Sequence, residues 1–249
     1  MLPAVTIPGI FVTGTDTGVG KTLIAAGIAD WFRRQGGKGR AAARIGVFKP
    51  VATGCAKRRE GLVSEDAEFL ALCADSSHSL DEICPQRFAE PLAPSVAAER
   101  ARQPLDWDAI ERSLRAIEAD SEVLIVEGVG GVMVPLDARH TVLEMIQWLR
   151  LPVVVVARPN LGTINHTLLT VDALRRAGAT VAGVVINRYP PEMASIAEET
   201  NPRLIEKWGK LSVLSIVPEE KVIPAAGIPP GVAAAMDLVD WERIARRGA

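Results

Sequence analysis

Short apolar runs alternate with longer amphipathic stretches along most of the chain. The apolar runs lie at residues 10–12, 45–48, 123–126, 152–157, 181–186 and 213–217. Such continuous runs, rich in valine and isoleucine, are typical of strands buried on both faces of a parallel sheet. The pattern therefore predicts an α/β fold, with a largely parallel sheet covered by helices on both faces.

The stretches between these runs have helical spacing, most clearly in residues 107–118. There Ile110, Leu114 and Ile117 fall on one side of the expected helix. Helices are expected at about residues 22–35, 64–72, 96–102, 107–118, 141–149, 160–177, 192–208 and 237–247. Pro202 is expected to kink or divide the helix that contains it.

Four stretches read as irregular. Residues 40–44 and 51–61 are expected to be loops, the second of them mobile, and residues 73–94 are interrupted by several prolines. Residues 223–231 are rich in proline and glycine and read as a linker before a short terminal helix at about 237–247. Since no linker is long enough to divide the chain, a single domain over residues 1–249 is the expected organisation.

A glycine-rich loop, residues 14–22, joins the first strand to the first helix. Strand, glycine-rich loop, Lys-Thr and helix are the context that a phosphate-binding P-loop requires. The backbone N–H groups around Gly18, Val19 and Gly20 would close on phosphate oxygens at the positive end of the helix. Lys21 would neutralise the β- and γ-phosphates, and the Thr22 hydroxyl would bind Mg²⁺.

The spacing of this loop differs from the usual motif. Five residues separate Gly14 from Gly20, whereas the usual pattern has four before its Gly-Lys pair, although the segment 18–22 is intact. The alternative is a glycine-rich turn that merely precedes an ordinary helix.

Polar residues follow several of the other predicted strands. Lys49 follows the strand at 45–48, and Glu127 follows the strand at 123–126 and precedes Gly128, Val129 and Gly130. Open α/β sheets bind ligands at the carboxyl ends of their strands. A carboxylate there resembles a Walker B acid, which holds Mg²⁺ or its waters; alternatively, Glu127 only ends the strand in solvent.

Composition narrows the classes of function. The chain has 28 basic and 30 acidic residues and a net charge of −2, so nucleic acid is not expected as the main partner. The three cysteines, Cys55, Cys73 and Cys84, form no CxxC pair, which favours a reducing, cytoplasmic compartment. The three histidines are scattered and do not have the spacing of metal ligands.

Nothing in the chain reads as a membrane or export signal. The first residues lack a charged segment before an apolar core, so no signal peptide is expected. The longest apolar run, residues 151–157, contains Pro152 and is too short to span a bilayer. The expected location is the cytoplasm, without membrane association.

Four segments together resemble the dethiobiotin synthetase family of P-loop enzymes. They are residues 11–22, the Lys-Pro-Val-Ala-Thr-Gly stretch at 49–54, residues 126–131, and the Leu-Gly-Thr-Ile-Asn-His stretch at 161–166. The resemblance extends from residue 11 to about residue 219, and the second and fourth segments are far more specific than the P-loop. The longer P-loop spacing is that family's own form.

The resemblance implies an ATP- and Mg²⁺-dependent ligase that closes a ureido ring. The substrates would be 7,8-diaminononanoate, CO₂ and ATP, and the products dethiobiotin, ADP and phosphate. One amine would be carboxylated to a carbamate, whose oxygen takes the γ-phosphoryl group to give a carbamic–phosphoric anhydride. Attack by the other amine would then close the ring.

The resemblance also assigns roles to residues. Lys21 and Lys49 would be the catalytic residues, which neutralise charge on the carbamate and the γ-phosphate. Metal ligands would be Thr22, Asp66 and Glu127, because oxygen donors suit a hard cation. Thr53 would hydrogen-bond the carbamate or amine region of the substrate, and Thr17 would be a further substrate-binding residue. The nucleotide would be bound by Gly18, Val19, Gly20, Lys21, Thr22, Leu23, Asp66, Glu127, Gly128, Val129, Gly130, Asn187, Arg188, Val217, Pro218 and Glu219, with the Asn187 amide reading adenine.

The segment from Leu161 to Asn165 has a separate role in the family. Leu161, Gly162 and Asn165 would receive the carboxylate tail of the substrate at a helix N-terminus. In the family this helix comes from the neighbouring subunit, so the resemblance implies a homodimer with the active site at the subunit interface. The alternative is an ordinary capped helix, in which His166 is a structural residue.

Two positions depart from the family pattern. Gly18 occupies a site that is often larger and sometimes acidic, so any contact from that side chain is absent. Arg188 stands where an acid can occur, which leaves the choice between ATP and other nucleotides open. The stretch at 36–44 and the tail beyond residue 231 have no counterpart in the family pattern.

Two other classes of protein were weighed. A cobyrinate-type amidating enzyme would need a glutaminase region with a nucleophilic cysteine, but the last cysteine is Cys84. A partitioning or membrane-site-selecting ATPase would carry an extra lysine early in the P-loop, and residues 15–17 contain none. Hydrophobic and arginine residues in the terminal helix suggest a membrane tether, but Asp237, Asp240 and Glu242 favour a packed helix.

Overall fold

The computed structural model describes residues 1–36, 43–59, 61–190 and 192–246. Its centre is a six-stranded sheet in the order β10-β9-β8-β1-β7-β2, in which all neighbouring strands run parallel. The strands are β1 (Gly9–Gly14), β2 (Ile45–Phe48), β7 (Val123–Gly131), β8 (Val153–Ala157), β9 (Val181–Tyr189) and β10 (Val213–Pro218). The predicted parallel α/β fold is confirmed.

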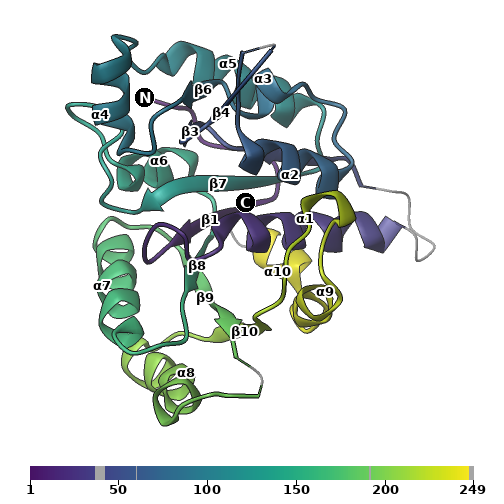
Figure 1. Cartoon of the computed structure of the whole chain (residues 1–249), viewed down its shortest axis with the longest axis vertical. Helices are drawn as coiled ribbons and strands as arrows, with labels where there is room; N and C mark the ends of the chain where they lie inside the picture. Colours follow the sequence, from purple (N-terminus) through teal and green to yellow (C-terminus); the bar gives the residue numbers. More distant parts are fainter. Residues whose placement is uncertain (37–42, 60, 191, 247–249) are drawn as a thin grey trace.

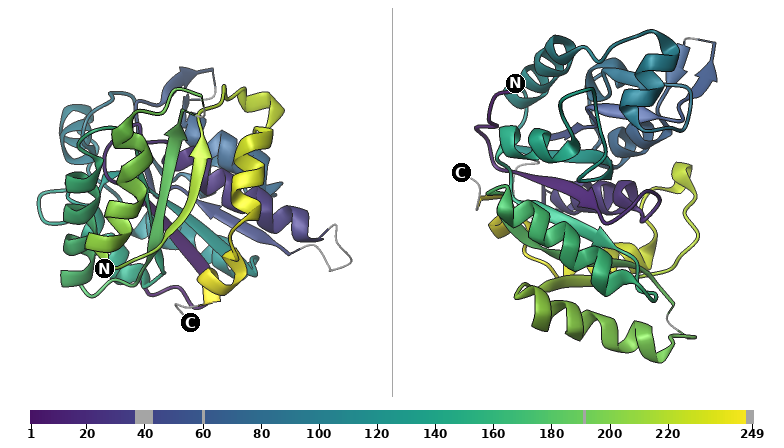
Figure 2. Two further views of the ribbon diagram at one scale, coloured as in Figure 1. Left: turned by 90° about the horizontal axis from the view of Figure 1, so that it is seen from below. Right: turned by 90° about the vertical axis from the view of Figure 1, so that its left-hand side faces the viewer.

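Helices cover both faces of this sheet (Figure 2). One face carries α1 (Lys21–Gly36), α9 (Pro230–Asp237) and α10 (Trp241–Ala245), and the other carries α6 (Val142–Leu149), α7 (Thr163–Arg176) and α8 (Ile196–Gly209). The helix α2 (Glu65–Ala74) packs against α1, and α5 (Trp107–Ala119) packs against α3 (Leu80–Ile83) beside β2 (Figure 1). The helix α4 (Pro94–Ala101) contacts the short strands β3 (Val51–Thr53) and β6 (Gln86–Phe88).

The hydrophobic pattern accounts for the main elements. All five residues of β8 are fully buried, as expected for a central strand of a covered parallel sheet. The predicted face of α5 is also correct, because Ile110, Leu114 and Ile117 are fully buried. Helix starts follow from local capping: Ser64 caps α2 by accepting from the Ala67 N–H, and Thr141 begins α6.

The expectation of a mobile loop at 51–61 and an irregular stretch at 73–94 is wrong. The first stretch contains β3 and β4 (Ala56–Arg58), and β5 (Gly61–Val63) follows at its end. The second stretch contains α3 and β6, and β3 pairs with β6 in parallel. Strands of three residues are too short to show an alternating pattern, and their pairing partners are distant in sequence.

The C-terminal expectation is also wrong in part. Residues 223–231 contain a 3₁₀ turn, η1 (Pro224–Ala226), and the start of α9, and a separate helix α10 follows. Prolines were read as breakers here, but Pro230 occupies the first position of α9, where its missing N–H costs nothing. Pro202 does not divide α8, which begins at Ile196 rather than near residue 192. Most of the predicted loop at 40–44 lies outside the described residues.

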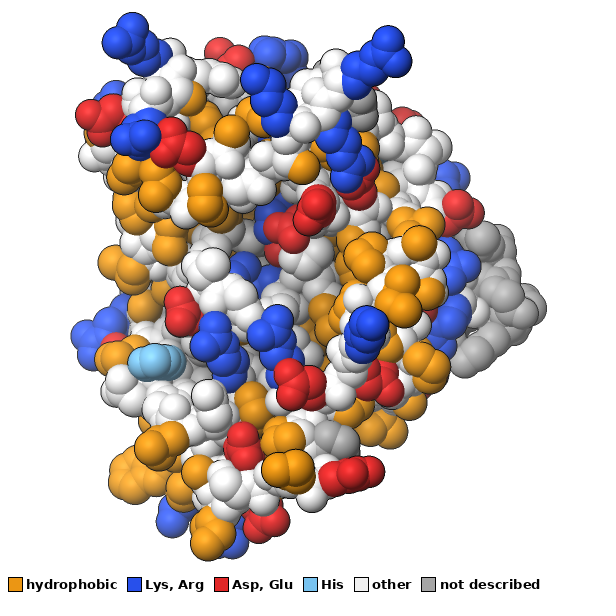
Figure 3. Space-filling model, in the orientation of Figure 1, with side chains coloured by type: hydrophobic (Ala, Val, Ile, Leu, Met, Phe, Trp, Pro, Cys, Tyr) orange, Lys and Arg blue, Asp and Glu red, His pale blue; other side chains and the backbone are white. Residues whose placement is uncertain are grey.

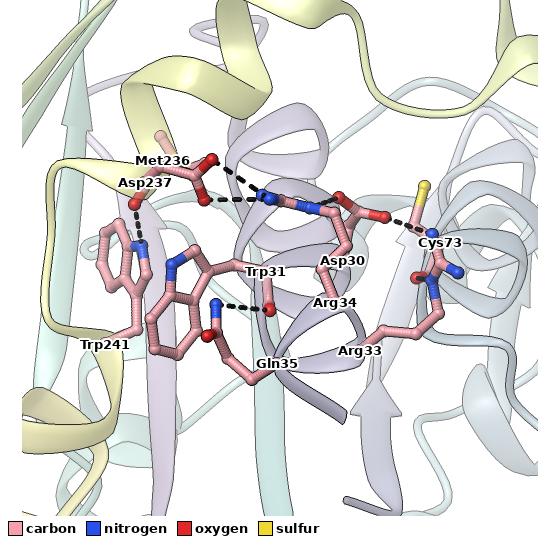
Figure 4. Close-up of polar contacts among 9 residues, drawn as sticks. All are labelled: Asp30, Trp31, Arg33, Arg34, Gln35, Cys73, Met236, Asp237 and Trp241. Carbon is pink, nitrogen blue, oxygen red and sulfur yellow. Dashed lines mark hydrogen bonds and ion pairs between the residues drawn. The ribbon is translucent and has the colours of Figure 1, made fainter. Parts of the chain in front are cut away.

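The C-terminal helices are fixed to α1 by polar contacts (Figure 4). Arg34 donates through Nη1 to both carboxylate oxygens of Asp237, at 2.9 and 3.1 Å. Its Nε and the Nη2 of Arg33 hold the buried Asp30 carboxylate at 2.7 and 2.6 Å. The fully buried Trp241 donates to the Met236 carbonyl at 2.9 Å. Trp241 and Ile244 of the terminal helix are therefore packed within the chain, whereas Leu238 is exposed.

Across the described residues, no helix is both long and apolar enough to cross a membrane.

Candidate active site

The P-loop lies at the carboxyl ends of the central strands, and α1 begins at Lys21. Gly20 has a φ of +94°, and a Cβ at this position would lie 2.0 Å from the Asn187 side-chain nitrogen. That nitrogen donates to the Val19 carbonyl at 2.9 Å. The end of β9 therefore packs directly against the loop, and only glycine fits at position 20.

Four side chains converge beside the P-loop. The Lys49 ammonium lies 2.6 Å from Oε1 of Glu127 and 2.9 Å from Oδ2 of Asp66. The Thr22 hydroxyl lies 2.9 Å from an oxygen of each of these two acids. Lys49 also donates to the Gly128 carbonyl at 3.3 Å. Four elements thus bring the predicted catalytic lysine and the three predicted metal ligands into one cluster: α1, the end of β2, α2 and β7.

Burial and the neighbouring charges shift the pKa values of this cluster in opposite directions. Burial alone would lower the pKa of Lys49, but Glu127 and Asp66 outweigh it and raise the pKa above its ordinary value. Partial burial disfavours the Asp66 anion, but Lys49 outweighs that effect and lowers the pKa of Asp66. Burial raises the pKa of Glu127, which Lys49 only partly offsets. Lys49 is therefore held as a cation that faces two acids.

Lys21 is buried at the floor of the loop. Its ammonium donates to the Asp16 carbonyl at 3.0 Å, so the loop itself supplies its acceptor. Burial lowers the pKa of Lys21 to about 8, although Glu127 partly opposes this effect. A phosphate group beside Lys21 would favour its charged form.

A cavity of about 410 Å³ lies over this cluster. It is lined by Thr17, Gly18, Gly20, Lys21, Thr22, Leu23, Lys49, Ala52, Thr53, Asp66, Phe69, Glu127, Val129, Gly130, Arg188 and Val222. Most of the predicted nucleotide, metal and substrate residues therefore share one cavity. Figure 3 views this side of the molecule and shows acidic and basic side chains around a hollow near its middle.

Several predicted residues do not line this cavity. Val19 and Gly128 lie beside it, and their backbone carbonyls accept hydrogen bonds from Asn187 and Lys49, respectively. Asn187 and Val217 are fully buried, and the Glu219 N–H donates to the Tyr189 carbonyl at 2.8 Å. Val217, Pro218 and Glu219 lie at the end of β10, next to β9. The assignment of Asn187, Val217, Pro218 and Glu219 to an adenine pocket stays a prediction.

The predicted tail-binding residues lie on the surface. Leu161 is 88% exposed, and Gly162 begins α7 with a φ of +93°. Asn165 and His166 are exposed on the first turn of α7. None of Leu161, Gly162 and Asn165 lines the described cavity of the same chain, so their role in substrate binding stays a prediction.

Unpaired buried polar atoms gather at this edge of the sheet. Among the described residues, five buried side-chain atoms have no hydrogen-bond partner. Four of the five belong to Thr13, Glu127, Arg158 and Asn187, on or just after the adjacent strands β1, β7, β8 and β9. Buried polar groups are normally paired, and of these four residues only Glu127 lines the described cavity, so its free oxygen is placed to meet a ligand there.

The residues present fit a magnesium ion. Thr22, Asp66 and Glu127 offer a hydroxyl and two carboxylates, and Oε2 of Glu127 is buried without a partner. No group of three or more His, Cys, Asp or Glu side chains in the described chain is placed to hold a metal alone. Mg²⁺ commonly takes only one or two carboxylates and completes its shell with phosphate oxygens and water.

Sequence reasoning missed four residues of this region. Ala52, Phe69 and Val222 line the cavity, and Arg158 lies directly after β8 with its guanidinium against the P-loop. Arg158 carried a usable signal, because it is a polar residue at the carboxyl end of a predicted strand. Phe69 and Val222 carried none, since apolar residues on a helix and in a loop look like core residues.

Comparisons with known proteins agree with this geometry. Residues 8–226 match the AAA domain family AAA_26. The ATP-dependent dethiobiotin synthetase BioD of Thermodesulfovibrio yellowstonii is 38% identical over 84% of this chain and 88% of its own length. The BioD protein of Bacillus velezensis is 36% identical over 96% of this chain and 98% of its own. That of Anaeromyxobacter dehalogenans strain 2CP-1 is 43% identical over 74% and 78%.

Solved structures share the fold at much lower identity. A ParA family ATPase of Chlorobium tepidum superposes with a TM-score of 0.58 at 12% identity, over 97% of this chain and all of that chain. The septum site-determining protein MinD of Pyrococcus horikoshii gives 0.56 at 15% identity, over 94% of each chain. These two proteins support the fold only. The P-loop, the cluster around Lys49 and the sequence identities with the BioD proteins all agree. The chain therefore belongs to the dethiobiotin synthetase family of P-loop enzymes.

Proposed function

We propose that this protein is an ATP-dependent dethiobiotin synthase, which closes a ureido ring on 7,8-diaminononanoate with CO₂. The observation that carries the proposal is the position of Lys49 between Glu127 and Asp66 beside the P-loop. A simple nucleotide switch needs no second buried lysine there. A reaction that moves a phosphoryl group onto a carbamate does need positive charge on both groups.

The chain's own residues would act mainly by positioning and charge neutralisation. The amides of the P-loop and Lys21 bind the phosphates of ATP, and Lys21 exchanges its Asp16 carbonyl contact for a phosphate oxygen. Lys49, kept protonated by its two acids, lies where it can neutralise the carbamate as its oxygen attacks the γ-phosphorus. ADP leaves, and the second amine then attacks the carbamate carbon and expels phosphate as the ring closes.

We propose that Thr22, Asp66 and Glu127 hold a magnesium ion together with the nucleotide phosphates. When bound, Mg²⁺ would neutralise charge on the β- and γ-phosphate oxygens. Thr17 and Thr53, both at the cavity wall, would hydrogen-bond the diamine end of the substrate. Asn187 would read adenine through its unpaired oxygen, which is an acceptor suited to an exocyclic amine.

We also propose a homodimer in which α7 of one chain completes the site of the other. The exposed Leu161 and Asn165 begin this helix but lie outside the cavity of their own chain. A helix N-terminus attracts carboxylates, so a second copy could bind the tail of the substrate. Three free, buried cysteines suit a cytoplasmic location, and all of residues 1–249 would act as one domain.

The decisive experiment supplies purified protein with ATP, Mg²⁺, bicarbonate and 7,8-diaminononanoate. Mass spectrometry should detect dethiobiotin, with ADP and phosphate formed in equal amounts. Omission of the diamine is the control and should leave only slow ATP hydrolysis. Turnover of a different acid or amine, with no dethiobiotin formed, would overturn the proposal.

A further inference from the structure

Arg158 is a charged residue at the site to which the proposed reaction assigns no role. It follows β8 directly and is partly buried. Its Nη2 donates to the Thr17 carbonyl at 2.9 Å, and its Nε is buried without a partner. The side chain thus reaches from the end of one strand to the P-loop that follows the neighbouring strand, β1.

Gly18 lies beside this contact. A Cβ built on Gly18 would lie 3.6 Å from the same guanidinium nitrogen of Arg158. An alanine Cβ would make ordinary van der Waals contact with Arg158 at this position. Gly18 also has a φ of +71°, so the loop turns here in a conformation that depends on glycine.

A bound phosphate group would displace one contact of the loop and leave another in place. The Lys21 ammonium is bound to the Asp16 carbonyl and lies in the cavity, so a phosphate group competes for it. The Thr17 N–H donates to the Asp16 carboxylate at 2.7 Å, a contact between neighbouring residues. Arg158 does not line the cavity, so its bond to Thr17 does not compete with the ligand.

We infer that Arg158 is a positioning residue for the phosphate loop. Its bond to the Thr17 carbonyl anchors the loop to β8 and holds the Gly18–Gly20 amides in their phosphate-binding arrangement while Lys21 changes partners. The role follows from the hydrogen bond and not from the positive charge alone. It deepens the proposed function and rests only on the nucleotide-binding part of it.

The test compares ADP binding to wild type, R158M and R158Q by isothermal titration calorimetry. Methionine and glutamine match each other in length and are both shorter than arginine; methionine has no donor, whereas glutamine keeps an N–H donor without the charge. We expect R158M to weaken ADP binding about tenfold, the size of one hydrogen bond, and R158Q to stay within about threefold of wild type. R112M, at an exposed position on α5, is the matched control and should bind as wild type.

Steady-state kinetics and salt dependence separate positioning from other roles. R158M should raise the KM for ATP by the same factor as the Kd for ADP, with kcat at saturating ATP within about twofold of wild type. Wild-type affinity in R158M would overturn the inference. Equal losses in R158M and R158Q that vanish at high salt would also overturn it, because they would indicate charge alone.

R158L serves as a second donor-free variant in case R158M does not fold, and thermal melts check that each variant is folded. ADP titration does not require 7,8-diaminononanoate. If no dethiobiotin forms but R158M still loses ADP affinity while R158Q keeps it, the ring-closing function fails and the role of Arg158 stands.

Discussion

The Lys49 ammonium lies 2.6 Å from Oε1 of Glu127, and both side chains are almost completely buried. A buried ion pair of this kind is weak evidence for stability, but removal of one partner leaves an uncompensated charge. The pair therefore links catalysis to folding, and variants at Lys49 must be examined for both.

Lys49→Met should abolish turnover while nucleotide binding remains. Loss of the cation that bridges the two acids should lower kcat by about 10²- to 10³-fold, as for other groups that stabilise transferred charge. The Kd for ADP should change by less than about threefold, since the P-loop is intact. Measurement of dethiobiotin formation and ADP titration separates the two effects, and near wild-type turnover would remove Lys49 from the catalytic residues.

The same variant should also be less stable. Breaking a buried ion pair typically costs about 3–5 kcal/mol, because Glu127 is left without its counter-charge. The double variant Lys49→Met with Glu127→Gln should recover most of that stability without recovering activity. Urea unfolding of the wild type and both variants measures this. Equal stability of the two variants would mean that Glu127 is already neutral without Lys49.

Gly20→Ala should prevent nucleotide binding. The new Cβ would lie 2.0 Å from the Asn187 side-chain nitrogen, so the loop, Asn187 or both must move. Gly227→Ala is a matched control, because Gly227 also has positive φ but open space around it. Both variants place a side chain at positive φ, at a cost of about 1–3 kcal/mol, and only Gly20→Ala adds the clash. Equal ADP affinity in the two variants would contradict the contact with Asn187.

Two inactive variants should restore activity when they are combined. Lys49→Met inactivates the site of its own chain, whereas Asn165→Asp places a negative charge where the partner's substrate carboxylate is expected. In a mixed dimer one of the two sites contains neither change, so co-refolded equal amounts should regain about a quarter of wild-type activity. No recovery, with dimers present by light scattering, would indicate that each chain forms its site alone.

Asp137 should make stability depend on acid pH. Its carboxylate accepts from Trp107 Nε1 at 2.8 Å, from the Arg139 N–H at 2.7 Å and from the His140 N–H at 2.8 Å. Partial burial opposes the anion, but hydrogen bonds from His140, Arg139 and Trp107 outweigh it and lower the pKa of Asp137 to about 2.

A lowered pKa in the folded state stabilises the protein above the ordinary pKa of an aspartate, near 4. That contribution is lost as the pH falls from about 4 through about 2. Asp137→Asn should therefore be less stable than wild type at neutral pH, and the difference should shrink toward pH 2. Asp108→Asn, at an exposed position on α5, is the control and should cost less stability than Asp137→Asn in urea unfolding at neutral pH.

The main elements could be predicted from the sequence, whereas short elements that depend on contacts between distant segments could not. The central strands and α5 were identified because each buries a continuous or regularly spaced set of apolar residues, such as Ile110, Leu114 and Ile117. The short pair of β3 and β6 was missed because it is set by the contact of two distant segments. The start of α9 was missed because Pro230 can end one element or begin another.

The site was predicted unevenly for a similar reason. Lys49 and Glu127 were found because polar residues at strand ends stand out, and the fold brings strand ends together. Strand order could not be read from the chain, so the proximity of Arg158 to Thr17 was not predicted. The burial of Asn187 beneath the P-loop was likewise not predicted, since it depends on how closely β9 approaches Gly20.

The unpaired polar atoms at the edge of the sheet make the stability of the folded protein depend on bound nucleotide. Each such atom costs about 1–3 kcal/mol while it is buried without a partner. A bound nucleotide would remove part of that cost and also stabilise the fold by mass action. The protein should then resist proteolysis better with bound nucleotide than without it.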